Sequence, residues 1–429
     1  MNLNTSNEQL LSLIHASVSP YHAVKEAIAR LEEAGFEEWP LDSSQKLEPG
    51  KGYYTDIYGT TLAAFRMPKN PVKKFRIAAA HTDHPCFRIK PNPDQKTAIY
   101  HKLNLEQYGG AILNTWMDRP LAIAGRVCIK SEDPFRPAVM FYSSDRPVAV
   151  IPNLAIHMNR EVNKGVALKV QTDMEALLTF LNGEKKDGLL DRIASELGVL
   201  REDILDYDLY VVNGEQGRTI GYENEMIQAP RLDNLTSCQS CLHGLLANGS
   251  LEDEVSMIVL FDNEECGSRS KQGADSTVLL NLMEKMMLCS GQDSRTAFLN
   301  AVMSSFIVSL DVAHASHPNH PEKADPTNPI RLDGGVILKL NSNQRYATDS
   351  TAVSVVEAIC QKHQIPYQKF VNHGDIAGGG TLGSILSSTI PAKTVDVGVP
   401  LLGMHSSCEL MAASSQLAMN HFAEAFFAE

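Results

Sequence analysis

An apolar run that ends abruptly in acidic residues constrains this chain more than any other feature. Residues 255–261 have the apolar composition of a buried strand, and Asp262, Glu264 and Glu265 follow at once. Several carboxylates at one buried strand end are costly unless a cation or a proton neutralises them. Two adjacent glutamates can also divide the work, because one can bind a metal ion while its neighbour acts as a general base. The pattern therefore predicts a metal site at this strand end.

Three further strand-like runs end in residues that can bind metal. They are residues 75–80 before His81 and Asp83, residues 306–310 before Asp311, and residues 394–399 before the loop that carries His405. In an open α/β sheet, ligands bind beyond the carboxyl ends of the strands. We therefore expect the four strand ends to meet in one site, and the chain to be an α/β metalloenzyme.

The candidate residues of this site are spread over most of the chain. In chain order they are His81, Asp83, Asp233, Glu264, Glu265, Asp311 and His405. Each has an ordinary structural explanation when taken alone; Asp233, for example, could simply cap the helix that it precedes. Their recurrence at strand ends favours a joint site, in which two ions about 3.5–4 Å apart would share a carboxylate. Asp83 lies two residues from His81 and could orient its imidazole.

The composition is that of an ordinary soluble globular protein. The chain has 429 residues, of which 43% are hydrophobic and 21% charged. A net charge of −13 argues against nucleic-acid and anionic-membrane partners, because both would repel it. No stretch approaches the roughly 20 apolar residues of a membrane span, and the N-terminus lacks a secretory pattern. The eight scattered cysteines suit a reducing compartment, so we expect a cytoplasmic protein.

A change in the pattern of strand-like and helical stretches along the chain predicts two domains. Residues 1–90 and 230–429 carry the strand-like runs that end in candidate site residues. Residues 91–229 have short alternating stretches and helical patterns, and His157 is their one obvious site residue. We therefore expect a discontinuous catalytic domain over residues 1–90 and 230–429, interrupted by an inserted domain over residues 91–229.

Short motifs lie along nearly the whole chain, at residues 81–83, 108–110, 116–119, 151–157, 229–235, 262–265, 314–319, 343–348 and 404–406. Together they resemble the motifs of the aspartyl aminopeptidases, cytosolic di-zinc exopeptidases, in their bacterial form. It implies a phosphorylase/hydrolase-like, mixed-sheet α/β catalytic domain with an inserted β-rich domain for dimerisation and substrate access. It also implies a homododecamer built from dimers.

The resemblance further implies roles for individual residues. The metal ligands would be His81 and Asp311 for one zinc ion, Glu265 and His405 for the other, and Asp233 as the bridge. Glu264 would be the general base, with Asp83 in the catalytic group. The substrate contacts would be His157 from a neighbouring subunit, Glu264, Asp311, His314, Lys339 and Tyr346.

Manganese and cobalt are alternatives to zinc, since such sites select weakly among these ions. Related di-zinc peptidases hold the bridging aspartate through a cis bond, so we expect a cis Asp233–Asn234 peptide.

The strand-end site and the resemblance together predict a metalloaminopeptidase that removes N-terminal residues from peptides, and the resemblance implies a preference for acidic ones. Lys339 could be a solvent-facing lysine at a sheet edge, but the resemblance favours an ammonium that pairs with an acidic substrate side chain. The alternatives are a related metal-dependent deacylase or amidase, an aminopeptidase of non-acidic preference, and a non-catalytic protein that keeps the fold. The intact candidate set counts against the last. His84, Asp349 and Ser384 depart from the family pattern and bear on substrate preference more than on metal binding.

Overall fold

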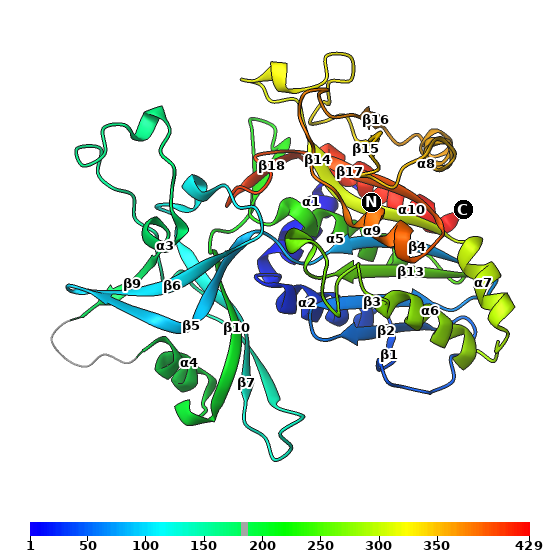
Figure 1. Ribbon diagram of the computed structural model, residues 1–429. Helices are drawn as coiled ribbons and strands as arrows, with labels where there is room; N and C mark the ends of the chain where they lie inside the picture. Colours follow the sequence, from blue (N-terminus) through cyan, green and yellow to red (C-terminus); the bar gives the residue numbers. More distant parts are fainter. Residues whose placement is uncertain (182–187) are drawn as a thin grey trace. The chain divides into compact units, whose positions relative to one another are not determined.

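The computed structural model describes residues 1–181 and 188–429, which form two compact units (Figure 1). The first unit comprises Met1–Asp83, Gly217–Met404 and Glu409–Glu429, and the second comprises His84–Gln216 and His405–Cys408. These limits differ from the expected ones at residues 90 and 230, because strand pairing rather than sequence texture decides them. Strand β5 (Cys86–Thr97) pairs within the second unit, whereas β11 (Arg218–Ile220) and β12 (Met226–Ala229) pair within the first.

The first unit is built on a 12-stranded mixed sheet. Its main path runs β1-β2-β3-β13-β4-β14-β17-β18-β12-β11, and β15 and β16 branch from β17. The remaining bounds are β1 (Glu37–Glu38), β2 (Gly52–Ile57), β3 (Thr61–Arg66), β4 (Lys74–His81), β13 (Glu254–Phe261), β14 (Phe306–His314), β15 (Val336–Lys339), β16 (Tyr367–Phe370), β17 (Lys393–Leu402) and β18 (Glu409–Ala412). The central strands β13, β4, β14 and β17 are parallel. Their carboxyl ends therefore meet at one edge of the sheet.

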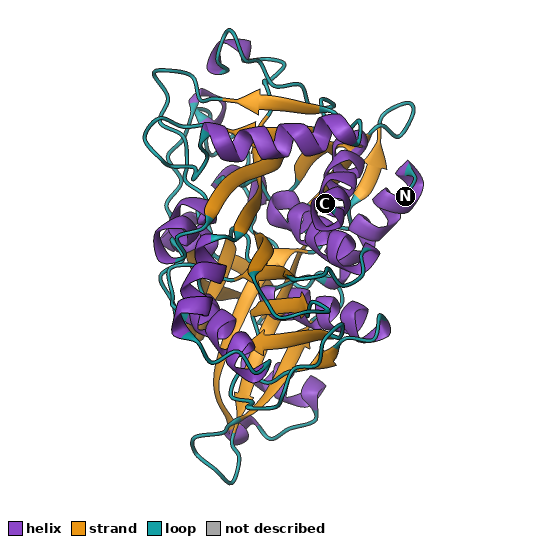
Figure 2. Ribbon diagram, turned by 90° about the vertical axis from the view of Figure 1, so that its right-hand side faces the viewer, coloured by secondary structure: helices purple, strands orange, loops and turns teal. Residues whose placement is uncertain are grey.

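Helices cover both faces of this sheet (Figures 1 and 2). One core contains residues of α1 (Leu3–Ala16), α2 (Pro20–Glu33), α5 (Leu232–Ala247), α8 (Ser350–Lys362) and α10 (Ala413–Ala428), and the other contains residues of α6 (Val278–Cys289), α7 (Arg295–Met303) and α9 (Leu382–Thr389). Along β13, Ile258 and Leu260 belong to the first core, and Met257 and Val259 to the second. This alternation marks a strand that is buried on both faces. The expected mixed-sheet α/β fold is confirmed.

The second unit contains a six-stranded antiparallel sheet in the order β8-β7-β10-β5-β6-β9. Its other elements are β6 (Tyr100–Tyr108), β7 (Leu121–Ile129), β8 (Ala138–Ser143), β9 (Ala176–Phe180), β10 (Ile204–Asn213), α3 (Val170–Asp173) and α4 (Leu189–Leu197). This unit is rich in β structure, as the resemblance implies, and its part in dimerisation stays a prediction. Among the described residues of the whole chain, every helix is too short or too polar to cross a membrane.

Candidate metal centre

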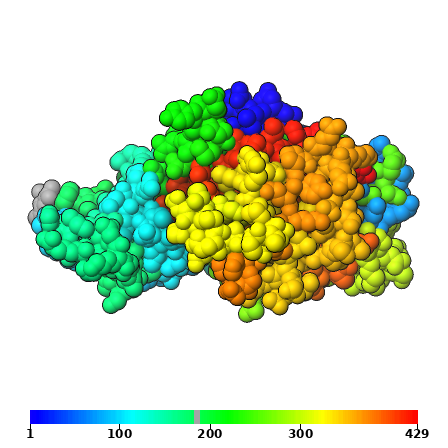
Figure 3. Space-filling view, turned by 90° about the horizontal axis from the view of Figure 1, so that it is seen from above, coloured from blue at the N-terminus to red at the C-terminus, as the bar shows by residue number. Residues whose placement is uncertain are grey.

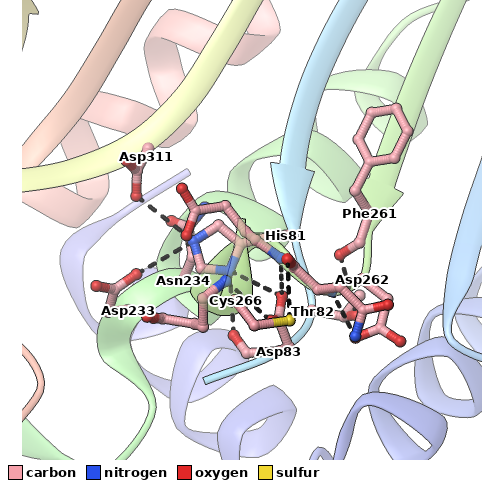
Figure 4. Close-up of polar contacts among 12 residues, drawn as sticks. His81, Thr82, Asp83, Asp233, Asn234, Phe261, Asp262, Cys266 and Asp311 are labelled. Atoms are coloured by element: carbon pink, nitrogen blue, oxygen red, sulfur yellow. Dashed lines mark hydrogen bonds and ion pairs between the residues drawn. The ribbon is translucent and has the colours of Figure 1, made fainter. Parts of the chain in front are cut away.

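The carboxyl ends of three neighbouring parallel strands bring His81, Asp311 and the two glutamates together. His81 ends β4 opposite Phe261, the last residue of β13, and Asp311 lies on β14, the other neighbour of β4. The short 3-10 helix η4 (Glu264–Cys266) follows β13 and carries both glutamates. Figure 4 shows the side chains of Asp233 and Asp311 directed toward the His81 ring. Three of the four predicted strand ends thus bring their residues into one cluster in space.

His81 lies at the centre of this cluster. Its Nε2 is 3.3 Å from Oδ1 of Asp233 and 3.6 Å from Oδ1 of Asp311, and its Nδ1 is 3.1 Å from the backbone oxygen of Asp83. One ligand atom each of His81, Asp233 and Glu265 lie within 4.8 Å of one another. One imidazole and two carboxylates are a donor set that a zinc ion accepts.

Asp83 holds the turn that carries both glutamates. Its Oδ1 accepts a hydrogen bond from the backbone N–H of Glu264, and its Oδ2 accepts one from the backbone N–H of Glu265, each at 3.1 Å. The same Oδ1 lies 3.4 Å from Nδ1 of His81. Asp83 is fully buried, so these charge-assisted bonds are strong. Asp83 therefore fixes the relative positions of the imidazole and the two glutamates.

Asp233 lies in the first turn of α5, where the backbone is irregular. The Asp233–Asn234 peptide bond is cis, which confirms the expectation from the resemblance. Arg231 precedes the helix as its N-cap, so Asp233 is not the cap that the sequence left open. The N–H of Asp233 donates to Oε2 of Glu409 at 2.9 Å. Glu409 is buried, and it could not be predicted from the sequence, because no motif marks an acid at the start of an apolar strand.

Buried negative charge exceeds positive charge in this cluster. Burial raises the pKa of Glu264 to about 7; the His81 charge opposes this shift, and repulsion from Asp311 adds to it. Burial and repulsion from Asp233 raise the pKa of Glu265 well above its ordinary value. Burial alone would lower the pKa of His81, but hydrogen bonds to Asp233, Asp311 and Asp83 outweigh it and raise that pKa. Such a cluster calls for further cations, and its oxygen and nitrogen donors fit zinc.

A family model for aminopeptidase I zinc metalloproteases (M18) matches residues 13–427. The chain belongs to this family. It is 44% identical over 407 residues to the "Probable M18 family aminopeptidase 2" of Clostridium novyi, with 94% of each chain covered. It is 40% identical over 425 residues to the protein of that name in Clostridium acetobutylicum, with 98% of each covered.

Solved structures agree with this assignment. The chain matches the cryo-EM structure of the Ape4 and Nbr1 complex with a TM-score of 0.94 and 31% identity, over 99% of this chain and 86% of that chain. It matches the S. cerevisiae mApe1 dodecamer with a TM-score of 0.86 and 25% identity, over 99% and 97% of the two chains. This M18 aminopeptidase is therefore a zinc metallo-exopeptidase, as the sequence predicts, and the enzymatic reading prevails over the non-catalytic one.

In this aminopeptidase, Lys339 is paired with Asp311 inside the first unit. Its Nζ lies 2.9 Å from Oδ2 of Asp311 and 5.4 Å from the centre of the Tyr346 ring. Only 2% of Lys339 is exposed, which rules out a solvent-facing lysine. Gly398 permits the pairing: it lies opposite Asp311 on β17, and a Cβ there would be 1.9 Å from the Asp311 backbone oxygen and 3.4 Å from Cε of Lys339.

The other predicted residues of the aminopeptidase have different settings. His314 is exposed at the end of β14, and its ring centre is 6.2 Å from that of Phe370. His157 and His405 belong to the second unit, where His157 lies in an exposed turn and Nδ1 of His405 is 3.2 Å from the backbone oxygen of Gly110. Asp349 is the N-cap of α8, where its carboxylate accepts the N–H of Ala352 at 2.8 Å. A helix cap thus explains this departure from the family pattern.

Proposed function

We propose that this aminopeptidase binds two zinc ions at the strand-end cluster and removes acidic residues from the N-termini of peptides. The observation that carries the proposal is the convergence of His81, Asp233 and Glu265 within 4.8 Å, with the Asp311 carboxylate beside His81. In this proposal His81 and Asp311 hold one ion, Glu265 holds the second, and Asp233 bridges the two. The further ligand of the second ion is His405, and this assignment rests on the resemblance alone.

Glu264 is the proposed general base. Bound zinc lowers the pKa of a water molecule to about 7 and polarises a carbonyl group. Glu264 takes a proton from the attacking water and delivers it to the leaving amine. Burial suits its carboxylate to this task, because it raises the affinity for a proton that must be held between the two transfers. Asp83 keeps the backbone of Glu264 in place during both transfers.

The acidic cluster also favours cleavage at the N-terminus. A substrate carries a free α-ammonium group, which is attracted to carboxylates, and Glu264 and Asp311 are its proposed contacts. Lys339 has three N–H donors, and one of them serves Asp311. The remaining donors can pair with an acidic side chain on the first residue of the substrate. Tyr346 and His314 complete the proposed contacts from the same subunit.

We also propose that the enzyme is a cytoplasmic homododecamer built from dimers, in which His157 reaches a neighbouring active site. The S. cerevisiae mApe1 structure that the chain matches is described as a dodecamer. Around His157, the side chains of Leu154, Ile156 and Met158 are 58%, 49% and 73% exposed. Three exposed apolar side chains within one short loop are typical of a surface that a partner covers. This supports an interface at the His157 loop.

A panel of aminoacyl chromogenic substrates, assayed with added zinc, manganese or cobalt, tests the proposed function. We expect turnover that requires metal and that is fastest for N-terminal Asp and Glu. Faster cleavage of Ala or Leu substrates would contradict the acidic preference. Cleavage of N-acyl substrates only would indicate a deacylase.

A further inference from the structure

A cavity of about 300 Å³ opens beyond the end of β14, and the proposed mechanism leaves most of its polar groups unused. The loop after β14, the loop after β16 and the end of β17 line it. The first two of these segments, coloured yellow and orange, adjoin on the surface in Figure 3. The lining residues that matter are His314, His317, Lys323, Asp325, Phe370 and His373. We call this cavity the β14 pocket.

Two histidines of the β14 pocket are oriented by the same local hydrogen bond. The backbone N–H of Asn319 donates to Nδ1 of His317, and the backbone N–H of Asp375 donates to Nδ1 of His373, each at 3.2 Å. A ring nitrogen that accepts a hydrogen bond carries no proton, so the proton of the neutral ring is on Nε2. Both rings therefore offer an Nε2–H donor.

The β14 pocket is lined by one cation, Lys323, and by one carboxylate, Asp325. Lys323 is exposed and forms no salt bridge within residues 1–181 and 188–429, and its charge acts on the carboxylate of its neighbour Glu322. Asp325 is the acidic residue of the lining, and its carboxylate accepts four hydrogen bonds of 2.8–3.0 Å from Thr327 and Asn328. These bonds lower the pKa of Asp325 to about 2, so its carboxylate is ionised, and they hold that carboxylate in its own turn. The groups that can bind an anionic ligand are therefore Lys323 and the two Nε2–H donors, on the side of the pocket that Asp325 does not occupy through its hydrogen-bonded turn.

The β14 pocket lies within reach of a peptide bound at Asp311. His314, on its wall, lies three residues after Asp311, which is about 10 Å along a strand that rises about 3.3 Å per residue. An extended peptide advances about as far in three residues. A peptide whose first bond lies at Asp311 can therefore reach the pocket with its third or fourth residue.

We propose that the β14 pocket is a subsite for a carboxylate downstream of the scissile bond. The carboxylate comes from an acidic side chain or from the free C-terminus of a short peptide, and both have the same chemistry. Nε2–H of His317, Nε2–H of His373 and Nζ of Lys323 bind it. This inference rests on the proposed aminopeptidase function and adds a second point of substrate recognition to it.

Matched tetrapeptides test the subsite. They share an N-terminal Asp, carry Glu or Gln at the third position, and have a free or amidated C-terminus. We expect kcat/KM to be about fivefold to tenfold higher with Glu or with the free terminus, as for one charge-assisted hydrogen bond at a partly exposed site. A response to Gln identifies the side chain as the source, and a response to amidation identifies the terminus. Asp-p-nitroanilide, which ends just beyond the scissile bond, is the reference substrate.

Two substitutions at His373 separate its two nitrogen atoms. In His373→Asn the amide oxygen replaces Nδ1 and can still accept the N–H of Asp375, but the Nε2–H donor is lost. In His373→Gln the amide nitrogen replaces Nε2 and keeps that donor. We call the kcat/KM of the charged tetrapeptide divided by that of its neutral match the peptide ratio. We expect His373→Asn and Lys323→Met to reduce this ratio at least threefold and His373→Gln to retain most of it. Lys393→Met removes an equal charge at the start of β17 and should leave the ratio unchanged.

The outcomes distinguish the subsite from the proposed function. Wild-type ratios near one, or unchanged ratios in both His373→Asn and Lys323→Met, would overturn the subsite while Asp-p-nitroanilide is still cleaved. Failure to cleave Asp-p-nitroanilide with any metal would overturn the proposed function. In that case calorimetric binding of the same tetrapeptides to metal-loaded wild-type protein decides about the subsite, because the Glu to Gln affinity ratio needs no turnover.

Discussion

Lys339 and Asp311 form a buried ion pair across Gly398, with Nζ of the lysine 2.9 Å from Oδ2 of the aspartate. The other oxygen of the same carboxylate, Oδ1, lies 3.6 Å from Nε2 of His81. One carboxylate thus joins the candidate metal cluster to the residue proposed to select acidic substrates. A change in Lys339 should therefore affect both stability and specificity.

Replacement of Lys339 by methionine should cost about 3–5 kcal/mol of unfolding free energy, because it leaves Asp311 charged, buried and without its partner. It should also lower kcat/KM for all substrates, and more for Asp- and Glu-initiated ones than for Ala- and Leu-initiated ones. Urea unfolding and the four kcat/KM values measure these effects. Lys369→Met, which breaks a surface pair with Glu357, is the control and should change stability by less than about 1 kcal/mol. Equal kinetic losses would remove Lys339 from the specificity role.

The substitution Gly398→Ala tests the packing between β14, β15 and β17. The added Cβ would be 1.9 Å from the Asp311 backbone oxygen, so the strands must separate. We expect a loss of about 3 kcal/mol or more, at the upper end for overpacking. Gly249→Ala is the matched control, because no atom lies within 4 Å of a Cβ built there. Equal stability of the two variants would contradict the close approach at Gly398.

Most residues of the candidate metal cluster could be grouped from the sequence alone, for a physical reason. Parallel strands end at one sheet edge, so His81, Glu264, Glu265 and Asp311 could be grouped from the residues that precede them. Pairings across the sheet could not be read in this way. The Lys339–Asp311 ion pair depends on β15 and β14 both pairing with β17, and nothing local to β15 indicates that.

The unit boundaries and the position of Glu409 beside Asp233 could not be predicted from sequence patterns, for a related reason. The residue pattern of 84–90 and 217–229 does not assign these segments to one sheet. Their hydrogen-bond partners, which lie far along the chain, decide the unit to which they belong. Glu409 has a short apolar strand around it, so its bond to the backbone of Asp233 leaves no periodic signal. Long-range strand pairing and single hydrogen bonds from a side chain to the backbone therefore could not be predicted from the sequence.

Asp83→Asn should weaken metal binding without unfolding the enzyme. The amide nitrogen would face one of the two backbone N–H groups that Asp83 now accepts, so the turn that carries Glu264 and Glu265 would shift. We expect about a 10–100-fold loss in zinc affinity or activity, the usual effect of changing a residue that supports metal ligands. Zinc titration with a competing chelator measures it. Zinc affinity and turnover equal to wild type would show that Asp83 has no supporting role.

Removal of metal should make stability fall as pH rises toward neutrality. Without zinc, the pKa of Glu264 in the folded protein is raised from 4.5 to about 7. Its contribution to stability is therefore full below about pH 4.5 and is lost as the pH rises to about 7. Thermal unfolding in excess chelator should show Tm decreasing over this range relative to the zinc-loaded enzyme. Parallel Tm profiles with and without metal would contradict the excess of buried negative charge.

Zinc content and turnover measured together on Glu264→Gln test the central claim most directly. Glutamine keeps the shape of Glu264 and removes its basicity, so this variant should bind as much zinc as the wild-type enzyme while turnover of an Asp-initiated substrate falls about 10²–10⁴-fold. Asp233→Ala, measured alongside, should lose zinc and activity together. A Glu264→Gln variant with wild-type turnover, or an Asp233→Ala variant that is fully metallated and active, would contradict the account.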